Sequence, residues 1–188
     1  MNSGASVGGD ERLRLFLALR LPRRTIDAIE RWQRVSLRDV RVVPRAQLHV
    51  TLAFLGTRPA ADLDPVLDAL RQAAATAGDV RLTPTRYRET RSVGMLLLDD
   101  GDGAAGALAD DLQRRLESLG VYRRERRIWL PHLTVARFRE RPHLQPEPPP
   151  ARTFVPSDAA AYLSRLRPGG AEYHVLESVA LGERVGGE

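Results

Sequence analysis

A short segment that occurs twice in the chain constrains its fold more than any other feature of the sequence. Residues 48–54 read LHVTLAF and residues 131–138 read PHLTVARF, so both contain His, an apolar residue, Thr, an apolar residue and Ala in the same order. Side chains two positions apart on a β-strand share a face, and such alternation is typical of a strand with one buried face. The repeat predicts two half-buried strands whose polar faces carry His49 with Thr51 and His132 with Thr134.

Hydrophobic periodicity predicts an α+β chain around these two strands. Apolar residues recur at helical spacing over residues 22–37, 62–77 and 104–119. Local strand pairing mixed with helical returns favours α+β over a doubly wound parallel sheet. The segments that read as strands are residues 13–19, 41–43, 47–55, 80–88, 93–98, 128–138, 158–166 and 172–181.

The length of 188 residues fits one large domain or two small lobes. We expect a flexible tail over residues 1–11, a single bilobal domain with one His-x-Thr motif per lobe over 12–182, and a second flexible tail over 183–188. A Pro-rich connector over 142–156 is predicted to be an extended surface loop. The acidic turn at 99–103 is expected to cap the helix after it, because its carboxylates do not match a calcium loop.

The absence of two residue types excludes several kinds of chemistry. The chain contains no Cys and no Lys, so all 29 basic residues are Arg, set against 24 Asp and Glu. Without Cys there is no thiol nucleophile or thiolate metal site, and without Lys there is no Schiff base or lysyl-nucleotide intermediate. The net charge of +5 suits an anionic partner, since Arg binds phosphate through paired hydrogen bonds.

The duplicated motif carries the candidate chemistry. If the two polar strand faces meet across a cleft, they present two imidazoles and two hydroxyls to one small group. One imidazole can remove a proton from an attacking oxygen while the other protonates the leaving oxygen, which suits a phosphodiester. Two other interpretations are a pair of structural His residues bonded to their own Thr neighbours, and a zinc site, for which the sequence supplies no third ligand nearby.

Targeting and membrane signals are absent from the sequence. The longest apolar run, over residues 13–21, is interrupted by Arg14 and Arg20 and is far shorter than the roughly 20 residues of a membrane helix. The polar N-terminus lacks the apolar region of a signal peptide. We therefore expect a cytoplasmic protein that does not contact a membrane, and nothing in the sequence specifies more than a monomer.

With these motifs and their flanks, residues 12–182 resemble the two-histidine phosphoesterases, and within them the bacterial and archaeal RNA 2',3'-cyclic phosphodiesterases, also called 2'-5' RNA ligases. The resemblance implies a bilobal, pseudo-two-fold α+β fold in which antiparallel sheets line a central cleft and helices lie outside. It also implies hydrolysis of a terminal 2',3'-cyclic phosphate to a 2'-phosphate without a metal or cofactor. The segments that carry it are residues 14–22, 48–56, 131–137 and 163–173.

The same resemblance implies roles for individual residues. His49 would be the proton donor to the leaving 3' oxygen and His132 the proton acceptor from water, although the residues alone leave their order open. Thr51 and Thr134 would bind the phosphate. The substrate-binding candidates are Arg137, Phe16 and Arg127. Arg137 lies on the opposite strand face from His132 unless a bulge intervenes. Phe16 is either a base-stacking residue or part of a second small core, and Arg127 belongs to the basic run beside the second motif.

Three other functions stay open at this stage. The chain could act on a small cyclic nucleotide, or join RNA ends through a 2'-5' bond in the reverse direction. It could also bind RNA ends without turnover. Segment 86–94 lacks the Phe-Pro and Trp signature of the resembled family, so the motifs define the reaction better than the substrate. The expected partners are RNA 3' ends or nucleotides that carry a 2',3'-cyclic phosphate.

Overall fold

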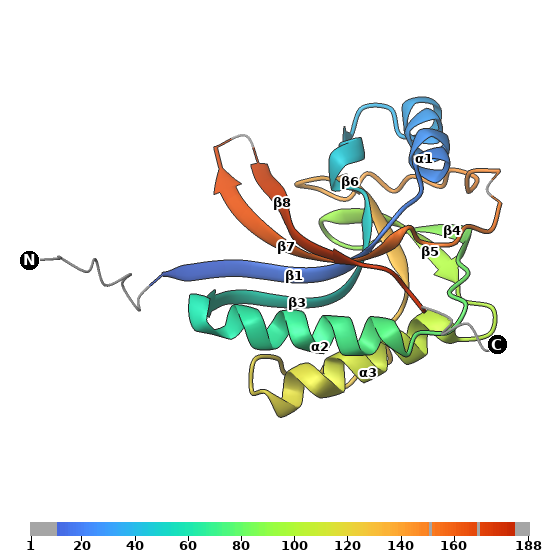
Figure 1. The fold of residues 1–188 in the computed structure, drawn as a ribbon. Coiled ribbons are helices and arrows are strands. Elements are labelled where there is room, and N and C mark those ends of the chain that lie inside the picture. Colours follow the sequence, from blue (N-terminus) through green and yellow to red (C-terminus); the bar gives the residue numbers. More distant parts are fainter. Residues whose placement is uncertain (1–10, 151, 169, 183–188) are drawn as a thin grey trace, which may run out of the picture.

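The computed structural model describes residues 11–150, 152–168 and 170–182 (Figure 1). The helices are α1 (Arg23–Ser36), α2 (Leu63–Ala75) and α3 (Ala104–Ser118), with 3-10 turns at Arg45–Gln47 and Ala60–Asp62. The strands are β1 (Arg12–Arg20), β2 (Arg41–Val42), β3 (His49–Pro59), β4 (Thr83–Glu89), β5 (Val93–Asp99), β6 (His132–Arg137), β7 (Asp158–Arg167) and β8 (Gly170–Val179).

Two predicted strands are shorter than the periodicity indicated. β4 begins at Thr83, because Leu82 makes only an isolated bridge to Phe154 of the Pro-rich connector. β6 begins at His132, after a segment that leaves the sheet and exposes 96% of Ile128. The predicted tails lie outside the described residues except for Glu11, whose carbonyl accepts a hydrogen bond from Ala60 N–H at 2.8 Å.

In the described part of the chain, the strands form one curled antiparallel sheet in the order β4-β5-β6-β3-β1-β7-β8, and β2 pairs with β6. The expected two sheets are therefore continuous, joined where Val50 of β3 pairs with Leu133 of β6. On one side of this junction β1 and β7 follow β3, and on the other β5 and β4 follow β6. This arrangement is the pseudo-two-fold α+β fold that the duplicated motif predicted.

The helices cover the outside of the sheet (Figure 1). α2 and α3 pack side by side along the half that contains β1 and β3, and α1 lies toward the half that contains β4, β5 and β6. The core between these layers includes the alternating leucines of β1, with Leu17 and Leu19 fully buried. No helix in the described residues is long and apolar enough to cross a membrane.

The opposite face of β1 is buried as well. Phe16 and Ala18 form a second, smaller cluster with Ala160 and Tyr162 of β7. β1 is a central strand whose two edges pair with β3 and β7, and on this second face Phe16 and Ala18 are covered by the side chain of Tyr162 and by Tyr173, which packs against the cluster. Residues 15–19 are therefore buried on both faces, while Arg14 of the same strand lines a pocket.

The acidic turn before α3 caps that helix, as the sequence predicted. The carboxylate of Asp100 accepts hydrogen bonds from the N–H groups of Ala105 and Gly106, at 2.9 and 2.7 Å. Free N–H groups and the helix dipole make the start of a helix a favourable place for a carboxylate. The Asp100 carboxylate therefore stabilises the start of α3.

Candidate active site

A β-bulge follows the Thr of each His-x-Thr motif. In β6, Thr134 lies opposite Met95 and Ala136 opposite Gly94, so Val135 is an extra residue. In β3, Thr51 lies opposite Ala18 and Ala53 opposite Leu17, so Leu52 is extra in the same way. An extra residue reverses the faces of the side chains beyond it.

The bulges decide which side chains share a face with the histidines. Arg137 stands five positions after His132 and would lie on the opposite face of a regular strand. The bulge turns it into the pocket that also contains Thr134 and His49. Phe54 stands five positions after His49 and is turned into the same pocket. The sequence predicts Arg137 on the same face as His132 only if a bulge intervenes. The structure contains this bulge in β6 and a corresponding one in β3.

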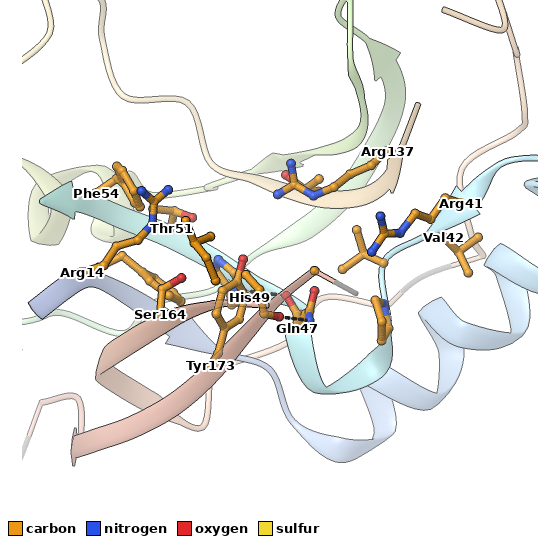
Figure 2. A pocket seen from close by; sticks show the side chains of 17 residues that line it. Arg14, Arg41, Val42, Gln47, His49, Thr51, Phe54, Arg137, Ser164 and Tyr173 are labelled. Carbon is orange, nitrogen blue, oxygen red and sulfur yellow. Dashed lines mark hydrogen bonds between the residues drawn. The ribbon is translucent and has the colours of Figure 1, made fainter. Parts of the chain in front are cut away.

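The pocket is a cavity of about 450 Å³ at the junction of the two halves (Figure 2). Three guanidinium groups, those of Arg14, Arg41 and Arg137, line it, and Figure 2 shows His49 of β3 and Tyr173 of β8 among them. Arg41 and Arg137 are opposite each other in the β2–β6 pairing. No acidic side chain lines this pocket among the described residues, so its field favours an anion.

Both histidines are held in the same way. The Nδ1–H of His49 donates to the carbonyl of Gln47, and that of His132 donates to the carbonyl of Leu130, each at 2.8 Å. A carbonyl can only accept, so each neutral imidazole has its proton on Nδ1 and its lone pair on Nε2. Each ring thereby presents Nε2 as the atom that can accept or, when charged, donate a proton.

Aromatic rings enclose His49. Its ring lies 4.9 Å from that of Phe16 and 5.6 Å from that of Tyr173, measured between centroids. Burial is the main cause that lowers the pKa of His49 to about 4, and the charges of Arg137 and His132 lower it further, against the hydrogen bond to Gln47. The ring of His49 is therefore neutral at pH 7 while the site holds no anion.

His132 opens toward a second, adjoining pocket. That pocket also contains Arg127 and Trp129, and it shares Thr51 and Phe54 with the first. The Trp129 indole donates to the carbonyl of Thr51 at 3.0 Å, which ties the segment before the second motif to the first motif. The two pockets are therefore parts of one groove, with His49 in one part and His132 in the other.

Six of the seven predicted site residues line this groove as polar groups, and Phe16 takes a different position. The side chain of Phe16 lies in the wall of the first pocket but is only 3% exposed. Its ring stacks on Tyr162 at 4.7 Å and meets Tyr173 edge-on at 4.8 Å, so little of it is left for a base. The structure therefore places Phe16 in a second small core, and its ring is not free to stack on a base.

Several residues of the site were missed by the sequence analysis. Phe54 occupies in the first motif the position that Arg137 occupies in the second, and this correspondence was a usable signal. Its side chain is 49% exposed, and the Arg14 guanidinium lies 4.8 Å from its ring centroid. Arg41 reaches the pocket because β2 pairs with the distant β6, and Tyr173 because the β7–β8 hairpin pairs with the distant β1, and no local pattern reveals either pairing.

The comparisons with known proteins agree with this architecture. Residues 21–167 match the family model of the 2'-5' RNA ligase superfamily. This chain belongs to that superfamily. A search of curated proteins gave no match.

Several solved structures have the same fold, and each aligns with nearly all of this chain. TT0787 of Thermus thermophilus is 28% identical, with a TM-score of 0.78 over 92% of this chain and 100% of that one. E. coli LigT complexed with NADP+ is 24% identical, with a TM-score of 0.79 over 93% and 100%. E. coli LigT complexed with 3'-AMP is also 24% identical, with a TM-score of 0.79 over 92% and 100%.

Proposed function

We propose that this member of the 2'-5' RNA ligase superfamily hydrolyses the 2',3'-cyclic phosphate at RNA 3' ends, or on nucleotides, to a 2'-phosphate. The observation that carries the proposal is the placement of two histidines, each held through Nδ1, in adjoining parts of one groove, with Arg137 and Thr134 beside His49 and Thr51 shared by both parts. Acid and base catalysis of a phosphodiester needs such a pair on either side of phosphorus.

In the proposed reaction, water attacks phosphorus and loses a proton to Nε2 of His132. The bond from phosphorus to the 3' oxygen breaks, and Nε2 of His49 gives that oxygen a proton. The products are a 2'-phosphate and a free 3' hydroxyl. Thr51 and Thr134 donate to the non-bridging oxygens, and Arg137 offsets the charge that grows on them in the transition state. Neither step requires a metal or a cofactor.

The low pKa of His49 fits this role only when substrate is bound. The positive charge of Arg137 is one of the causes that lower it. A cyclic phosphate carries one negative charge, which offsets that of Arg137 and favours the protonated imidazole. Binding of the anion therefore offsets one of the causes that lower the pKa of His49 and helps this imidazole to carry the proton that the leaving oxygen needs.

The surroundings of the histidines indicate a nucleotide rather than a bare phosphate. Phe54 presents an exposed ring on which a base can stack, and Arg127 and Arg123 line the part of the groove beyond His132. Nucleotides bound to a fold relative, E. coli LigT, are consistent with this assignment. With a 5' hydroxyl in place of water as the nucleophile, the same groups in the same roles would break the bond from phosphorus to the 3' oxygen and form a 2'-5' bond, which is the ligase reaction.

The test is incubation of the protein, in EDTA, with adenosine 2',3'-cyclic phosphate and with a short RNA that ends in this group, followed by 31P NMR of the products. We expect 2'-phosphate from both, and loss of product in His49→Ala and His132→Ala but not in His174→Ala, an exposed histidine outside the groove. Binding of the RNA without any product would instead indicate an RNA-end binder. Turnover of a small cyclic nucleotide alone would indicate a nucleotide-specific enzyme.

A further inference from the structure

Two buried glutamines occupy corresponding places in the two halves of the fold. Gln33 of α1 is 3% exposed and Gln113 of α3 is 8% exposed. Burial of an amide is unfavourable unless hydrogen bonds replace those it made to water. The partners of these two amides therefore indicate why the core contains glutamine at these positions.

Both amides bind the extra residue of a bulge. Gln113 Nε2 donates to the carbonyl of Leu52 at 2.8 Å. Gln33 Nε2 donates to the carbonyl of Val135 at 2.9 Å and to that of Val43 at 3.0 Å. Leu52 and Val135 directly follow the Thr of the two His-x-Thr motifs, so the same backbone atom is held in each copy.

The helices that supply these amides are exchanged between the two halves. α1 precedes β3 in the chain but holds the bulge of β6, whereas α3 precedes β6 but holds the bulge of β3. Each half of the active site is therefore fixed by a helix from the other half of the duplication. This exchange links the two motifs through the core, with Gln33 away from the groove and Gln113 at its edge.

We propose that Gln33 and Gln113 are positioning residues, which fix the two bulges and thereby aim Arg137 and Phe54 into the groove. Without its bulge, each strand would point the fifth residue after the His away from the groove. The glutamine amide binds the carbonyl of the extra residue and so holds the bulge in place. Gln33 acts through Arg137, the anion-binding side chain, and Gln113 acts through Phe54, the exposed ring. The inference deepens the proposed function and rests on it for the roles of these two side chains.

The first test removes the amide of Gln33 and keeps its bulk, with Gln33→Met. Its effect is measured on the affinity for inorganic phosphate, alone and combined with Arg137→Met. We expect Gln33→Met to weaken phosphate binding about 10-fold, as a displacement of about 1 Å can do, and to have almost no further effect in Arg137→Met. Gln145→Met, at an exposed glutamine of the connector, is the matched control.

The second test uses Gln113→Met with Phe54→Leu and 3'-AMP as the probe. Gln113 makes one hydrogen bond and lies at the edge of the second pocket, so its replacement disturbs the core less. We expect weaker binding of 3'-AMP with unchanged binding of inorganic phosphate, and no added effect when Phe54→Leu is already present. This variant tests the proposal even if Gln33→Met does not fold.

Effects that add independently in both double variants would overturn the proposal, because they would mean that the amides only stabilise the core.

An NMR measurement on the protein without any ligand separates this proposal from the proposed function. The Nε–H signal of Arg137 in a 15N NMR spectrum should shift in Gln33→Met and stay unchanged in Gln113→Met. If that pattern appears in a protein that never hydrolyses a cyclic phosphate, the proposed function fails while the positioning role stands. An unshifted Arg137 signal in folded Gln33→Met contradicts the positioning role.

Discussion

Val50 of β3 lies directly opposite Leu133 of β6, so the middle residues of the two His-x-Thr motifs pair with each other. Both side chains are fully buried on the helix side of the sheet. Because the strands are antiparallel, the two motifs pass each other in opposite directions at this point. Each histidine is thereby brought alongside the threonine of the other motif, on the opposite face from the helices.

The two histidines should differ in what their removal does to stability. We expect His49→Ala and His132→Ala each to lower turnover by roughly 10²- to 10⁴-fold, the range for loss of a general acid or base. His49 also contacts the rings of Phe16 and Tyr173, so His49→Ala should lose about 1 kcal/mol of unfolding free energy, and His132→Ala less than about 0.5 kcal/mol. Single-turnover assays and urea unfolding measure the two effects. Large destabilisation by His132→Ala without a specific loss of turnover would contradict the account.

The burial of His49 should appear in the pH dependence of stability. Its pKa is about 4 in the folded protein and about 6.5 in an unfolded chain, so the unfolded state binds the proton first on acidification. The free energy of unfolding should therefore fall between pH 6.5 and pH 4, by on the order of 3 kcal/mol from this group. His49→Gln should lack this part of the loss when unfolding is followed across the same range. NMR titration of the imidazole should show its pKa rising when inorganic phosphate is added, and an unchanged pKa would argue against an anion site beside it.

Phe16 and Phe54 should have opposite effects when shortened. Phe16→Ala removes a 3% exposed ring from the aromatic cluster and should cost about 3 to 5 kcal/mol of stability. Phe54→Ala removes a half-exposed ring and should leave stability almost unchanged while raising KM for nucleotide substrates, as stacking is worth roughly 1 to 3 kcal/mol per base. Thermal unfolding and steady-state kinetics on adenosine 2',3'-cyclic phosphate separate the two. A raised KM in a fully stable Phe16 variant would return Phe16 to the role of base-stacking residue.

Arg127 and Arg137 should respond differently to the length of the substrate. Arg137 lies with His49 in the first pocket, so Arg137→Met should weaken turnover of every cyclic phosphate. Arg127 lines the second part of the groove, so Arg127→Met should affect RNA but spare the mononucleotide. Loss of one phosphate contact should also reduce the slope of log affinity against log salt by about 1. Equal losses on mononucleotide and RNA would mean that Arg127 does not contact the chain beyond the terminal nucleotide.

Much of the fold could be predicted because it is local in origin. The alternation of Leu in β1, the helical spacing in α2 and α3 and the carboxylate of Asp100 are patterns within a few residues, and the structure has elements at each of them. The junction of the sheet was also foreseeable in outline, because two copies of one motif imply two related halves. The second buried face of β1 was less visible, since Phe16 and Ala18 are covered by β7, which lies far away in sequence.

The site itself was predictable where the motif is repeated and not where it depends on pairing. His49, Thr51, His132 and Thr134 carry the repeat, and the structure places them at one junction. The bulges could not be read from the strands, because an extra residue is defined only against the partner strand. Without them, the face of Arg137 stays undetermined and Phe54 looks like an ordinary strand residue. The buried amides of Gln33 and Gln113 explain how the core fixes what the strand pattern leaves open.

The measurement that tests the central claim most directly uses a 2',3'-cyclic phosphate in which sulfur replaces the bridging 3' oxygen. A thiolate leaves without protonation, so this substrate removes the need for a general acid but not for a base. The account predicts that single-turnover hydrolysis by His49→Ala recovers to near the wild-type rate on the sulfur substrate, while His132→Ala stays inactive. Recovery in His132→Ala with continued inactivity in His49→Ala, or recovery in neither variant, would contradict the assignment of His49 as acid and His132 as base.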